Sequence, residues 1–592
     1  MKIKAKRVVL IFIHACIQFG AYTTAYGQQF TLVSSYAEQS ELTKTNGVAV
    51  ADYDQDGDLD IFIVAFNSFD PEDKSTWNRL LNNHKGTFSD FTVQAGFTPQ
   101  FQKATVGLHG NKIGASWGDY DNDGYPDLFL SNFGVDELWH NEQDGSFTNV
   151  AYSAGVRGCK DCYSVNGLWL DYDTDGDLDL YVSDYNQPNR MYENEGNGNF
   201  KEVTQESGLG DTGQTWTSLA IDVNNDGYQD IYVINDNGAN FFYLNQGDGT
   251  FLESTHEYGL EDGGNGMGVA ISDFNKDGLF DFYLTNIFDR QSNPFFVQNE
   301  YGTFDNKAVA LGIDSAGWAW GTRFFDVDHD MDEDLYVVTG NELSGTEDLN
   351  MFFENEASHF EDVSTDFNVN NNLDGRGLEV FDFDGDGDLD MLVSNWNGHL
   401  LLYRNNAWVD GSDNKNWIKI ELEGTTSNRD AFGSIVRISA GGEHQYRLKD
   451  GANLMGQSIL PIHFGLGSND VIEEIMVTWS SGVSETLQNI KVNHTIKIKE
   501  GQGVVTSIDE KKRAGNSLRS ISLFPNPAQS EVNIELSDQM IGSSIEIISL
   551  SGLVLKKEIS SQRVTKMNIQ QLNAGIYLIL VGGKHMHKFI KI

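Results

Sequence analysis

Seven short segments of the chain place acidic and amide side chains on alternate residues. The first segment, Asp52–Asp60, reads D-Y-D-Q-D-G-D-L-D, and every copy carries oxygen-bearing side chains at its positions 1, 3, 5 and 9. Short side chains of this kind on a tight turn can converge on one point, where a hard cation such as Ca²⁺ takes six to eight oxygen ligands. The pattern therefore predicts up to seven calcium sites, called loops 1 to 7 in chain order.

Each loop contributes four predicted calcium ligands. They are Asp52, Asp54, Asp56 and Asp60; Asp119, Asp121, Asp123 and Asp127; Asp171, Asp173, Asp175 and Asp179; Asp222, Asn224, Asp226 and Asp230; Asp273, Asn275, Asp277 and Asp281; Asp326, Asp328, Asp330 and Asp334; and Asp382, Asp384, Asp386 and Asp390. Position 6 is glycine in six loops, because the sharp turn needs a φ angle that glycine adopts without a steric penalty. Loop 6 has Met331 there, so we expect a strained turn and a doubtful calcium site.

The calcium loops of EF-hands begin in the same way but require a bidentate Glu at position 12 and an outgoing helix. Position 12 is aliphatic in all seven loops here, as in Ile63 and Leu130. The residues after each loop, such as Asp60–Val64, have the apolar character of a strand. Each loop is therefore expected to join two strands. A solvated turn without metal is the alternative for one copy, and seven copies in register argue against it.

The spacing of the loops indicates a repeat architecture. Successive loops start 67, 52, 51, 51, 53 and 56 residues apart, and each repeat also carries an Asn, a short turn and a Phe, as in Asn245–Phe251. Four short strands fit into each period. Seven four-stranded repeats predict an all-β fold, a seven-bladed β-propeller over residues 28–408, followed by two small β-rich, sandwich-like domains.

The two ends of the repeat array complement each other. The segment Phe30–Val33 has no blade before it, and the last repeat reaches Leu401–Asn405 without a matching Phe strand. We expect the N-terminal segment to complete the last blade and close the ring, because an open sheet edge invites association. An open solenoid would leave both fragments unmatched.

The repeats, from Phe30 to Asn405, resemble the FG-GAP or VCBS family of integrin α-subunit heads and bacterial surface proteins. That resemblance implies calcium at the loop positions named above. Residues 416–500, the second module, contain Asn428–Gly433, His463–Gly467 and Val477–Gly482, which resemble the ASPIC/UnbV domain of the cartilage acidic protein family. Phe432 departs from the usual Ile of that motif. His463 is interpreted as a packed strand residue and not as a catalytic group.

The two ends of the chain carry export signals. Residues 1–27 read as a signal peptide, with Lys2, Lys4, Lys6 and Arg7 before an apolar run too short to span a membrane. Cys16 offers a weaker lipoprotein alternative. A polar linker, 501–517, leads to the third module, 518–592, whose segments Leu523–Ala528, Leu572–Tyr577 and Lys588–Lys591 resemble a type A C-terminal sorting domain of type IX secretion. The resemblance implies contact with the secretion machinery and passage through the periplasm to the outer surface; an ordinary β-sandwich is the alternative.

The net charge and the cysteines indicate which ligands and which kinds of site this chain is expected to have. The net charge of −47 makes nucleic acid an improbable ligand, because phosphate binding needs a basic patch. Crowded carboxylates should repel one another without metal, which predicts that folding and calcium loading are linked. Beyond the predicted signal peptide the cysteines are Cys159 and Cys162; in an exported protein this pair predicts a local disulfide better than a zinc or redox site.

Strand direction places a second set of polar and aromatic residues at the end opposite the calcium loops. They are Asn132–Phe133, Asp184–Asn186, Asn235–Asn237, Asn286, Asn341, Asn395–Asn397, Trp216 and Trp320. Amide, carboxylate and aromatic groups on loops suit a glycan or a protein ligand, so the first hypothesis is a non-enzymatic surface module for binding or adhesion. The alternative reading is that the Asn and Asp residues only terminate strands and the Trp residues pack between blades.

An enzyme is the second functional hypothesis, for instance a calcium-assisted polysaccharide lyase. No nucleophile elbow, HExxH motif or Ser/His/Asp arrangement is visible in the sequence. A lyase needs Lys, Arg, Tyr or His side chains converging on a groove, and the candidates are Arg290, Tyr185 and His399. The fold alone does not decide between the two hypotheses.

Overall fold

The computed structural model describes residues 29–33, 42, 44–65, 74–97, 111–287, 292–340, 348–356, 359–396, 398–407, 415–508, 522–524, 528–536, 541–549, 553–573, 575–581 and 585–591. The predicted signal peptide, Cys16, Arg290, Asn341 and Asn397 lie outside these residues. The described chain is an all-β structure. No helix in the described part is long and apolar enough to cross a membrane.

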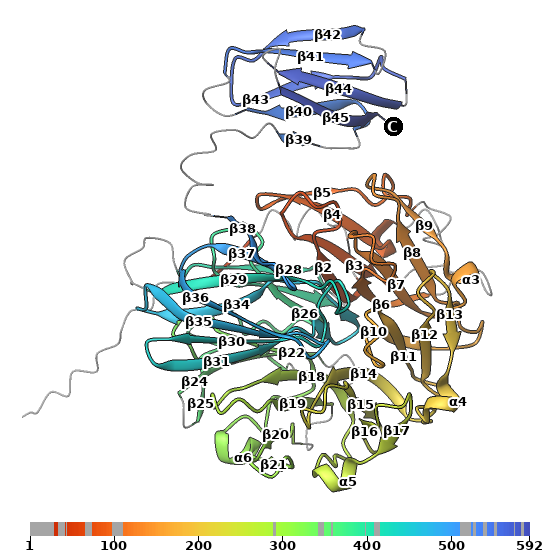
Figure 1. Cartoon of the computed structure of the whole chain (residues 1–592), viewed down its shortest axis with the longest axis vertical. Helices are drawn as coiled ribbons and strands as arrows, with labels where there is room; N and C mark the ends of the chain where they lie inside the picture. Colours follow the sequence, from red (N-terminus) through yellow and green to blue (C-terminus); the bar gives the residue numbers. More distant parts are fainter. Residues whose placement is uncertain are drawn as a thin grey trace, which may run out of the picture.

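Seven antiparallel sheets form the blades of a propeller in the part of the chain that is described (Figure 1). Their strands are, for blade 1, β2 (Thr45–Ala51), β3 (Asp60–Ala65), β4 (Arg79–His84) and β5 (Thr87–Asp90); for blade 2, β6 (Asn111–Gly118), β7 (Asp127–Phe133), β8 (Glu137–Asn141) and β9 (Phe147–Asn149); for blade 3, β10 (Ser164–Leu170), β11 (Asp179–Asp184), β12 (Arg190–Asn194) and β13 (Phe200–Glu202); and for blade 4, β14 (Gln214–Ile221), β15 (Asp230–Asp236), β16 (Phe241–Asn245) and β17 (Phe251–Glu253).

The remaining blades have the same order. Blade 5 contains β18 (Gly266–Ser272), β19 (Asp281–Asn286), β20 (Phe295–Gln298) and β21 (Phe304–Asn306); blade 6 contains β22 (Ala319–Phe325), β23 (Asp334–Thr339), β24 (Met351–Asn355) and β25 (Phe360–Asp362); and blade 7 contains β26 (Gly375–Phe381), β27 (Asp390–Asn395), β28 (Leu401–Asn405) and β1 (Phe30–Leu32). Single-turn helices α3 (Ala151–Ala154), α4 (Thr204–Ser207), α5 (Thr255–Tyr258) and α6 (Ala308–Leu311) follow the outer strands of blades 2 to 5, and η1 (Lys74–Thr76) precedes β4.

The predicted ring closure is confirmed. Strand β1 pairs antiparallel with β28, with Phe30 opposite Asn405. The Phe30 ring is buried and lies 6.2 Å from the ring of Phe352 in blade 6. The chain therefore closes its propeller by joining strands from both ends of the repeat array, which leaves blade 7 with the same four strands as its neighbours.

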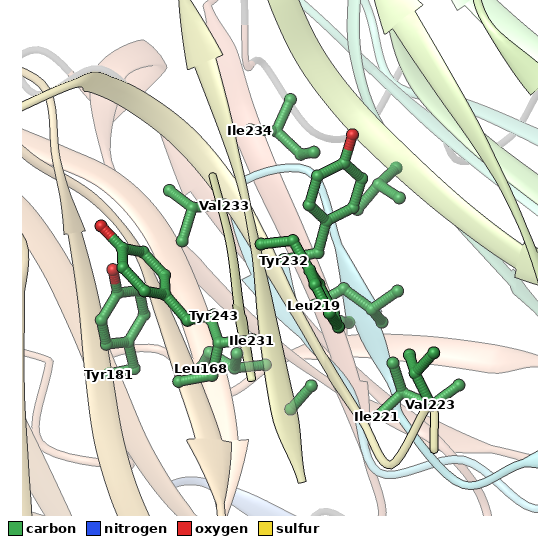
Figure 2. Packing of buried hydrophobic residues seen from close by; sticks show 14 of the residues in the cluster. Leu168, Tyr181, Leu219, Ile221, Val223, Ile231, Tyr232, Val233, Ile234 and Tyr243 are labelled. Carbon is green, nitrogen blue, oxygen red and sulfur yellow. The ribbon is translucent and has the colours of Figure 1, made fainter. Parts of the chain in front are cut away.

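The hydrophobic core lies between successive blades. Figure 2 shows the contact between blades 3 and 4, where Leu168 and Tyr181 of one blade lie close to Ile231 and Tyr243 of the other. Each blade is buried on both faces, so its second strand contains a continuous apolar run, as in Ile231–Ile234. Burial on both faces explains why these strands do not alternate between polar and apolar residues.

The second module is a sandwich of two four-stranded sheets. One sheet has the order β34 (Ile462–Gly467), β29 (Asn416–Glu423), β37 (Thr495–Lys499) and β38 (Gly503–Ile508); the other has the order β31 (Glu443–Leu448), β30 (Ile435–Ala440), β35 (Val471–Thr478) and β36 (Ser484–Lys491). Alternate residues of the facing strands, such as Ile418, Ile420, Val436 and Ile438, are buried in a core of their own. The predicted sandwich is confirmed for this module.

A short hairpin of the second module enters the centre of the propeller. We call β32 (Ala452–Asn453), the turn Leu454–Met455 and β33 (Gly456–Gln457) the central hairpin. Strand β33 adds parallel to β6 of blade 2, and the hairpin approaches the innermost strand of all seven blades. The channel that an isolated propeller would have is therefore filled by the second module.

The third module forms two further sheets. One contains β39 (Ser522–Phe524), β40 (Glu531–Glu535) and β43 (Val564–Asn568), and the other contains β42 (Val554–Ile559), β41 (Ser544–Ser549), β44 (Gly575–Val581) and β45 (His585–Lys591). Val532, Ile534, Ile545 and Ile547 lie in the buried cluster between them. A third hydrophobic core, separate from those of the propeller and the second module, thus supports this part of the chain.

Candidate calcium centres and the opposite aromatic face

Each predicted calcium loop forms a turn between the first and second strands of its blade. In loop 1 the Asp52 carboxylate accepts hydrogen bonds from the main-chain N–H groups of Asp56 (3.1 Å) and Gly57 (2.9 Å). The Asp60 carboxylate accepts from Tyr53 N–H at 3.2 Å. These bonds hold the two ends of the loop against its tip, so that ligand oxygens of Asp52, Asp54 and Asp60 lie within 4.8 Å of one another.

The same convergence recurs in loops 2 and 3. Ligand atoms of Asp119, Asp121 and Asp127 form one such group, and those of Asp171, Asp173 and Asp179 form another. In loops 4 to 7, burial first and then the nearby carboxylates at positions 1 and 5 raise the pKa of the carboxyl group at position 9. The predicted ligands at positions 1, 5 and 9 are therefore brought together in these loops as well.

The donor atoms at these loops fit a calcium ion. Oδ2 of Asp127 is buried and accepts no hydrogen bond from any described residue. One carboxylate oxygen each of Asp171, Asp281 and Asp384 is likewise buried and accepts no hydrogen bond from the described residues. A buried carboxylate oxygen without a partner costs free energy. Ca²⁺ prefers hard oxygen ligands of this kind and would satisfy all of them.

When no cation is present, burial and neighbouring carboxylates also raise the pKa of particular loop carboxyl groups. Desolvation, followed by the neighbouring Asp54 carboxylate, raises the pKa of Asp52 to about 7. Desolvation, followed by Asp175 and Asp173, raises the pKa of Asp171 to about 7. Burial raises the pKa of Asp230 to about 8. Keeping these buried carboxylates ionised costs free energy, and a bound divalent cation would remove that cost.

Loop 6 keeps the turn geometry although it lacks glycine. Met331 has a φ of 85°, close to the 90° of Gly57, so a side chain occupies the left-handed region. The Met331 side chain is buried, and its Sδ accepts from the Asn469 amide of the second module at 3.5 Å. The expected strained turn is therefore present at Met331. The packing of the Met331 side chain against the second module explains why a methionine occupies this position.

Protein cations lie beside three of the loops, which the sequence reasoning missed. In loop 7, Arg404 contacts Asp384 (2.9 Å) and Asp386 (3.0 Å), and Lys419 of the second module contacts Asp382 at 2.7 Å. Lys415 pairs with Asp328 in loop 6, and Arg429 lies 3.4 Å from Asp119 in loop 2. These cations neutralise part of the negative charge of the loops beside them, so the seven loops are not equivalent.

In blades 2 and 7 the residue before the landmark Asn contacts the loop of the same blade. In blade 2 this residue is His140, whose Nδ1 lies 3.1 Å from Asp127 and 3.4 Å from Asp121. The Asp127 carboxylate raises the pKa of His140 to about 9. The equivalent residue in blade 7 is Arg404. Its place one residue before the repeated Asn is a signal that could have identified it.

The landmark Asn residues connect each loop to the loop of the preceding blade. Asn141 donates its main-chain N–H to Asp127 (2.7 Å), and its side-chain amide donates to the carbonyls of Tyr53 (2.9 Å) and Pro126 (3.1 Å). The same main-chain bond to position 9 is made by Asn83, Asn194, Asn245, Gln298, Asn355 and Asn405. Blade 5 carries Asn299 before Phe304, but the bond to the preceding loop is made there by Gln298, whose longer side chain donates to the carbonyl of Val223.

The opposite end of the propeller surrounds the tip of the central hairpin. Each innermost strand has a β-bulge near its start, and a bulge re-aims a side chain. The residue six positions before each loop lies at this bulge; the seven residues are Asn46, Ile113, Val165, Trp216, Met267, Trp320 and Arg376. Ile113, Val165, Met267 and Trp320 pack around Leu454 and Met455 in one buried cluster.

Aromatic rings from several blades form a continuous row at this end. The ring centroids of Phe133 and Tyr163 are 5.3 Å apart, those of Tyr163 and Tyr185 5.4 Å, those of Tyr185 and Trp216 5.7 Å, and those of Trp216 and Trp320 5.5 Å. The Arg376 guanidinium lies 4.1 Å from the Trp320 ring. Phe133 is 51% exposed, and the row becomes more buried towards Trp320. We call these five rings the aromatic row.

The asparagines predicted to line this end have structural roles instead. The side-chain amides of Asn132, Asn235, Asn286 and Asn395 donate to carbonyls of their own turns, those of Val135, Ala239, Ser292 and His399. All four asparagines are buried. The alternative reading, in which Asn terminates the strand, is confirmed for these residues. Both tryptophans belong to the aromatic row; Trp320 is buried against the hairpin, whereas Trp216 is half-buried.

Three further residues named in the sequence analysis have clear positions. Cys159 and Cys162 form a disulfide in the turn before β10. His463 is buried in β34, where burial holds its pKa well below the usual value, in agreement with a packed strand residue.

Comparison with known proteins matches three families to separate parts of the chain. The family described as FG-GAP-like repeat matches residues 52–129, 171–233, 222–284 and 326–393, that described as ASPIC and UnbV matches residues 424–505, and that described as secretion system C-terminal sorting domain matches residues 522–592. The sorting domain indicates export by type IX secretion to the cell surface or outside.

Similar proteins include cartilage acidic protein 1 of Homo sapiens, 25% identical over 502 residues that cover 76% of this chain and 71% of that protein. Cartilage acidic protein 1 of Xenopus tropicalis is 26% identical over 490 residues, which cover 74% of this chain and 70% of that protein. Among solved structures, that of BBS1N in complex with ARL6DN has a TM-score of 0.38 and 11% identity, and it covers 62% of this chain and 94% of that chain. The chain is therefore an exported all-β protein that carries FG-GAP-like repeats, an ASPIC and UnbV domain and a secretion system C-terminal sorting domain.

Proposed function

We propose that this exported propeller is a calcium-stabilised surface module that binds a neutral glycan through the aromatic row. The observation that carries the proposal is the row itself, in which rings from blades 2, 3, 4 and 6 follow one another at 5.3 to 5.7 Å. Sugar rings stack on aromatic faces and hydrogen bond to polar groups beside them. A protein ligand is the competing outcome.

The charges around the row favour a neutral sugar over an acidic one. The Tyr185 hydroxyl donates to Asp236 at 3.1 Å, and the Arg376 guanidinium is paired with Asp374. The chain as a whole has a net charge of −47. A polyanion would meet carboxylates here, and like charges at short range are unfavourable.

Calcium has a structural part in this proposal. The loops lie at the opposite end of the blades from the row, so a bound ion would not touch a ligand there. The carboxylates at positions 1, 3, 5 and 9 would hold the ion, and the ion would fix the turns from which the second strands begin. The strand ends that carry Phe133 and Tyr185 are thereby positioned.

The lyase alternative receives no support from the positions of its candidate residues. Burial and the neighbouring Asp236 raise the pKa of Tyr185 to about 12, whereas a tyrosine that removes a proton near neutral pH needs a lowered pKa. The Asn395 amide donates to the main-chain carbonyl of His399. Arg290 lies outside the described residues.

A glycan array probed with the calcium-loaded protein tests the proposal. We expect binding to neutral glycans, and isothermal titration should show at least a tenfold weaker affinity for Phe133→Ala and for Tyr185→Ala. Tyr301→Ala is the matched control, because Tyr301 is 82% exposed in the turn after β20. Binding that both row variants leave unchanged would refute the assignment of the site. Unsaturated products released from polyuronates would instead favour the lyase.

A further inference from the structure

Two buried histidines meet a buried aspartate where the second module covers loops 6 and 7. His329 is position 4 of loop 6, Asp388 is position 7 of loop 7, and His463 lies on β34 of the second module. Their exposed fractions are 0% for His329, 0% for Asp388 and 9% for His463. None of the three belongs to the predicted calcium ligands.

Two separations at this place are compatible with a tetrahedral metal site. Nε2 of His329 lies 3.7 Å from Oδ1 of Asp388, and the centroids of the two imidazole rings are 5.1 Å apart. Metal–nitrogen bonds of about 2.0–2.1 Å at tetrahedral angles place two ligand atoms roughly 3.4 Å apart and two ligating imidazole centroids roughly 5 Å apart. The observed arrangement needs only small movements to reach that geometry.

The hydrogen bonding of the histidines points to a missing partner. Neither ring nitrogen of His329 has a hydrogen-bond partner among the described residues, and Nδ1 of His463 has none either. Buried polar groups are almost always paired, so three unpaired imidazole nitrogens at one place require a reason. Nε2 of His463 lies 3.1 Å from the Gly387 carbonyl, and a ligating histidine commonly donates its other ring N–H to such a carbonyl.

Neighbouring charges and contacts are compatible with a cation at this place. The basic side chains that act on these histidines are already paired, Lys419 with Asp382, Lys415 with Asp328 and Arg447 with Glu333. Trp417 stacks on His463, with ring centroids 6.3 Å apart, and Gly467 N–H donates to the His329 carbonyl at 2.8 Å. These contacts hold the ring of His463 and the main chain of His329 in place before any ion binds.

We propose that His329, Asp388 and His463 bind a divalent transition metal of the zinc class, at a site separate from the calcium loops. Imidazole nitrogen with one carboxylate is a ligand set that suits Zn²⁺ and Co²⁺ and does not suit Ca²⁺. The ion would join blades 6 and 7 to the second module.

Titration of the full-length protein with Co²⁺ in excess calcium tests this site, because calcium occupies the all-oxygen loops. We expect one equivalent of Co²⁺ with the visible absorption of a tetrahedral complex, displaced by Zn²⁺. His329→Gln and His463→Gln should each lose this absorption and the one-to-one binding. His256→Gln and His444→Gln, at exposed positions, should keep both. Absence of stoichiometric Co²⁺ binding, or binding that survives in both variants, would overturn the proposal.

A spectroscopic measurement keeps the test independent of the variants. If the histidine variants fail to fold, as judged by circular dichroism and gel filtration, X-ray absorption of the zinc-loaded wild-type protein counts imidazole ligands directly. Two imidazoles in the first coordination sphere support the site. A sphere that contains only oxygen contradicts it, because the ion would then lie in a calcium loop.

Discussion

The side-chain amide of Asn83 donates a hydrogen bond of 2.8 Å to the main-chain carbonyl of Phe383, 300 residues further along the chain. It also donates to the Leu59 carbonyl of its own blade at 3.0 Å. Asn83 therefore joins loop 1 to loop 7 and makes, between the first and last blades, the link that Asn141 and its equivalents make elsewhere. Sheet pairing of β1 with β28 completes blade 7, whereas this amide connects blade 7 to blade 1.

Replacement of Asn83 should weaken ring closure. Asn83→Ala leaves the buried carbonyls of Phe383 and Leu59 without this donor, and we expect a loss of about 1–3 kcal/mol in the free energy of unfolding. Urea denaturation of the calcium-loaded protein measures it. Asn197→Ala, at an exposed turn position of blade 3, is the control and should be nearly neutral. An unchanged denaturation midpoint for Asn83→Ala would show that β1 closes the ring unaided.

Calcium removal should make stability depend on pH in a defined direction. Without the ion, burial raises the pKa of Asp52 and Asp171 to about 7, above the usual 3.8. The folded state then binds more protons than the unfolded state between about pH 4 and pH 8, so stability falls as pH rises through this window. Protein freed of calcium on a chelating resin should melt at a lower temperature at pH 8 than at pH 5. Excess calcium should abolish this decline; a calcium-independent melting curve would refute the calcium assignment.

Loop 7 should bind calcium more weakly than loops without a neighbouring protein cation. Arg404 contacts two of its ligands, Asp384 and Asp386, and would lie against the ion. Arg404→Gln should therefore tighten one calcium site, which titration calorimetry would detect as a larger number of high-affinity sites. Arg437→Gln, which removes an arginine paired with Glu474 in the second module, is the control. Equal calcium binding by the two variants would mean that Arg404 moves away when the ion enters.

The central hairpin should tolerate no added bulk where it meets the blades. A Cβ atom at Gly47 would lie 2.4 Å from the Met455 carbonyl oxygen, which is a main-chain atom and cannot move alone. Gly47→Ala should therefore destabilise the protein by about 1–3 kcal/mol. Gly238→Ala is the control, since a Cβ there meets nothing within 4 Å. Thermal melting distinguishes the two variants, and comparable melting temperatures would mean that the hairpin is loosely held.

Much of the fold can be predicted from the sequence because the same pattern occurs seven times. An assignment that a single copy would leave open is supported by the other six. The spacing of Asp52, Asp119 and their equivalents determined the blade number, since each loop must join two strands of one sheet. The unmatched Phe30 and Leu401 segments determined how the ring closes. The ligand positions followed from the same register, because side chains on a tight turn converge whatever surrounds them.

Contacts between residues far apart in the chain were decided only by the tertiary structure. Nothing near Gly456 indicates that its strand would enter the propeller and pair with Ala115, and nothing near Asp382 indicates that Lys419 would reach it. The aromatic row and the pairing of His329 with His463 arise in the same way, from strands that start at one end of different blades or belong to another module. A local pattern determines which turns form, because its atoms are neighbours in the chain, whereas the packing of complete blades determines which side chains meet.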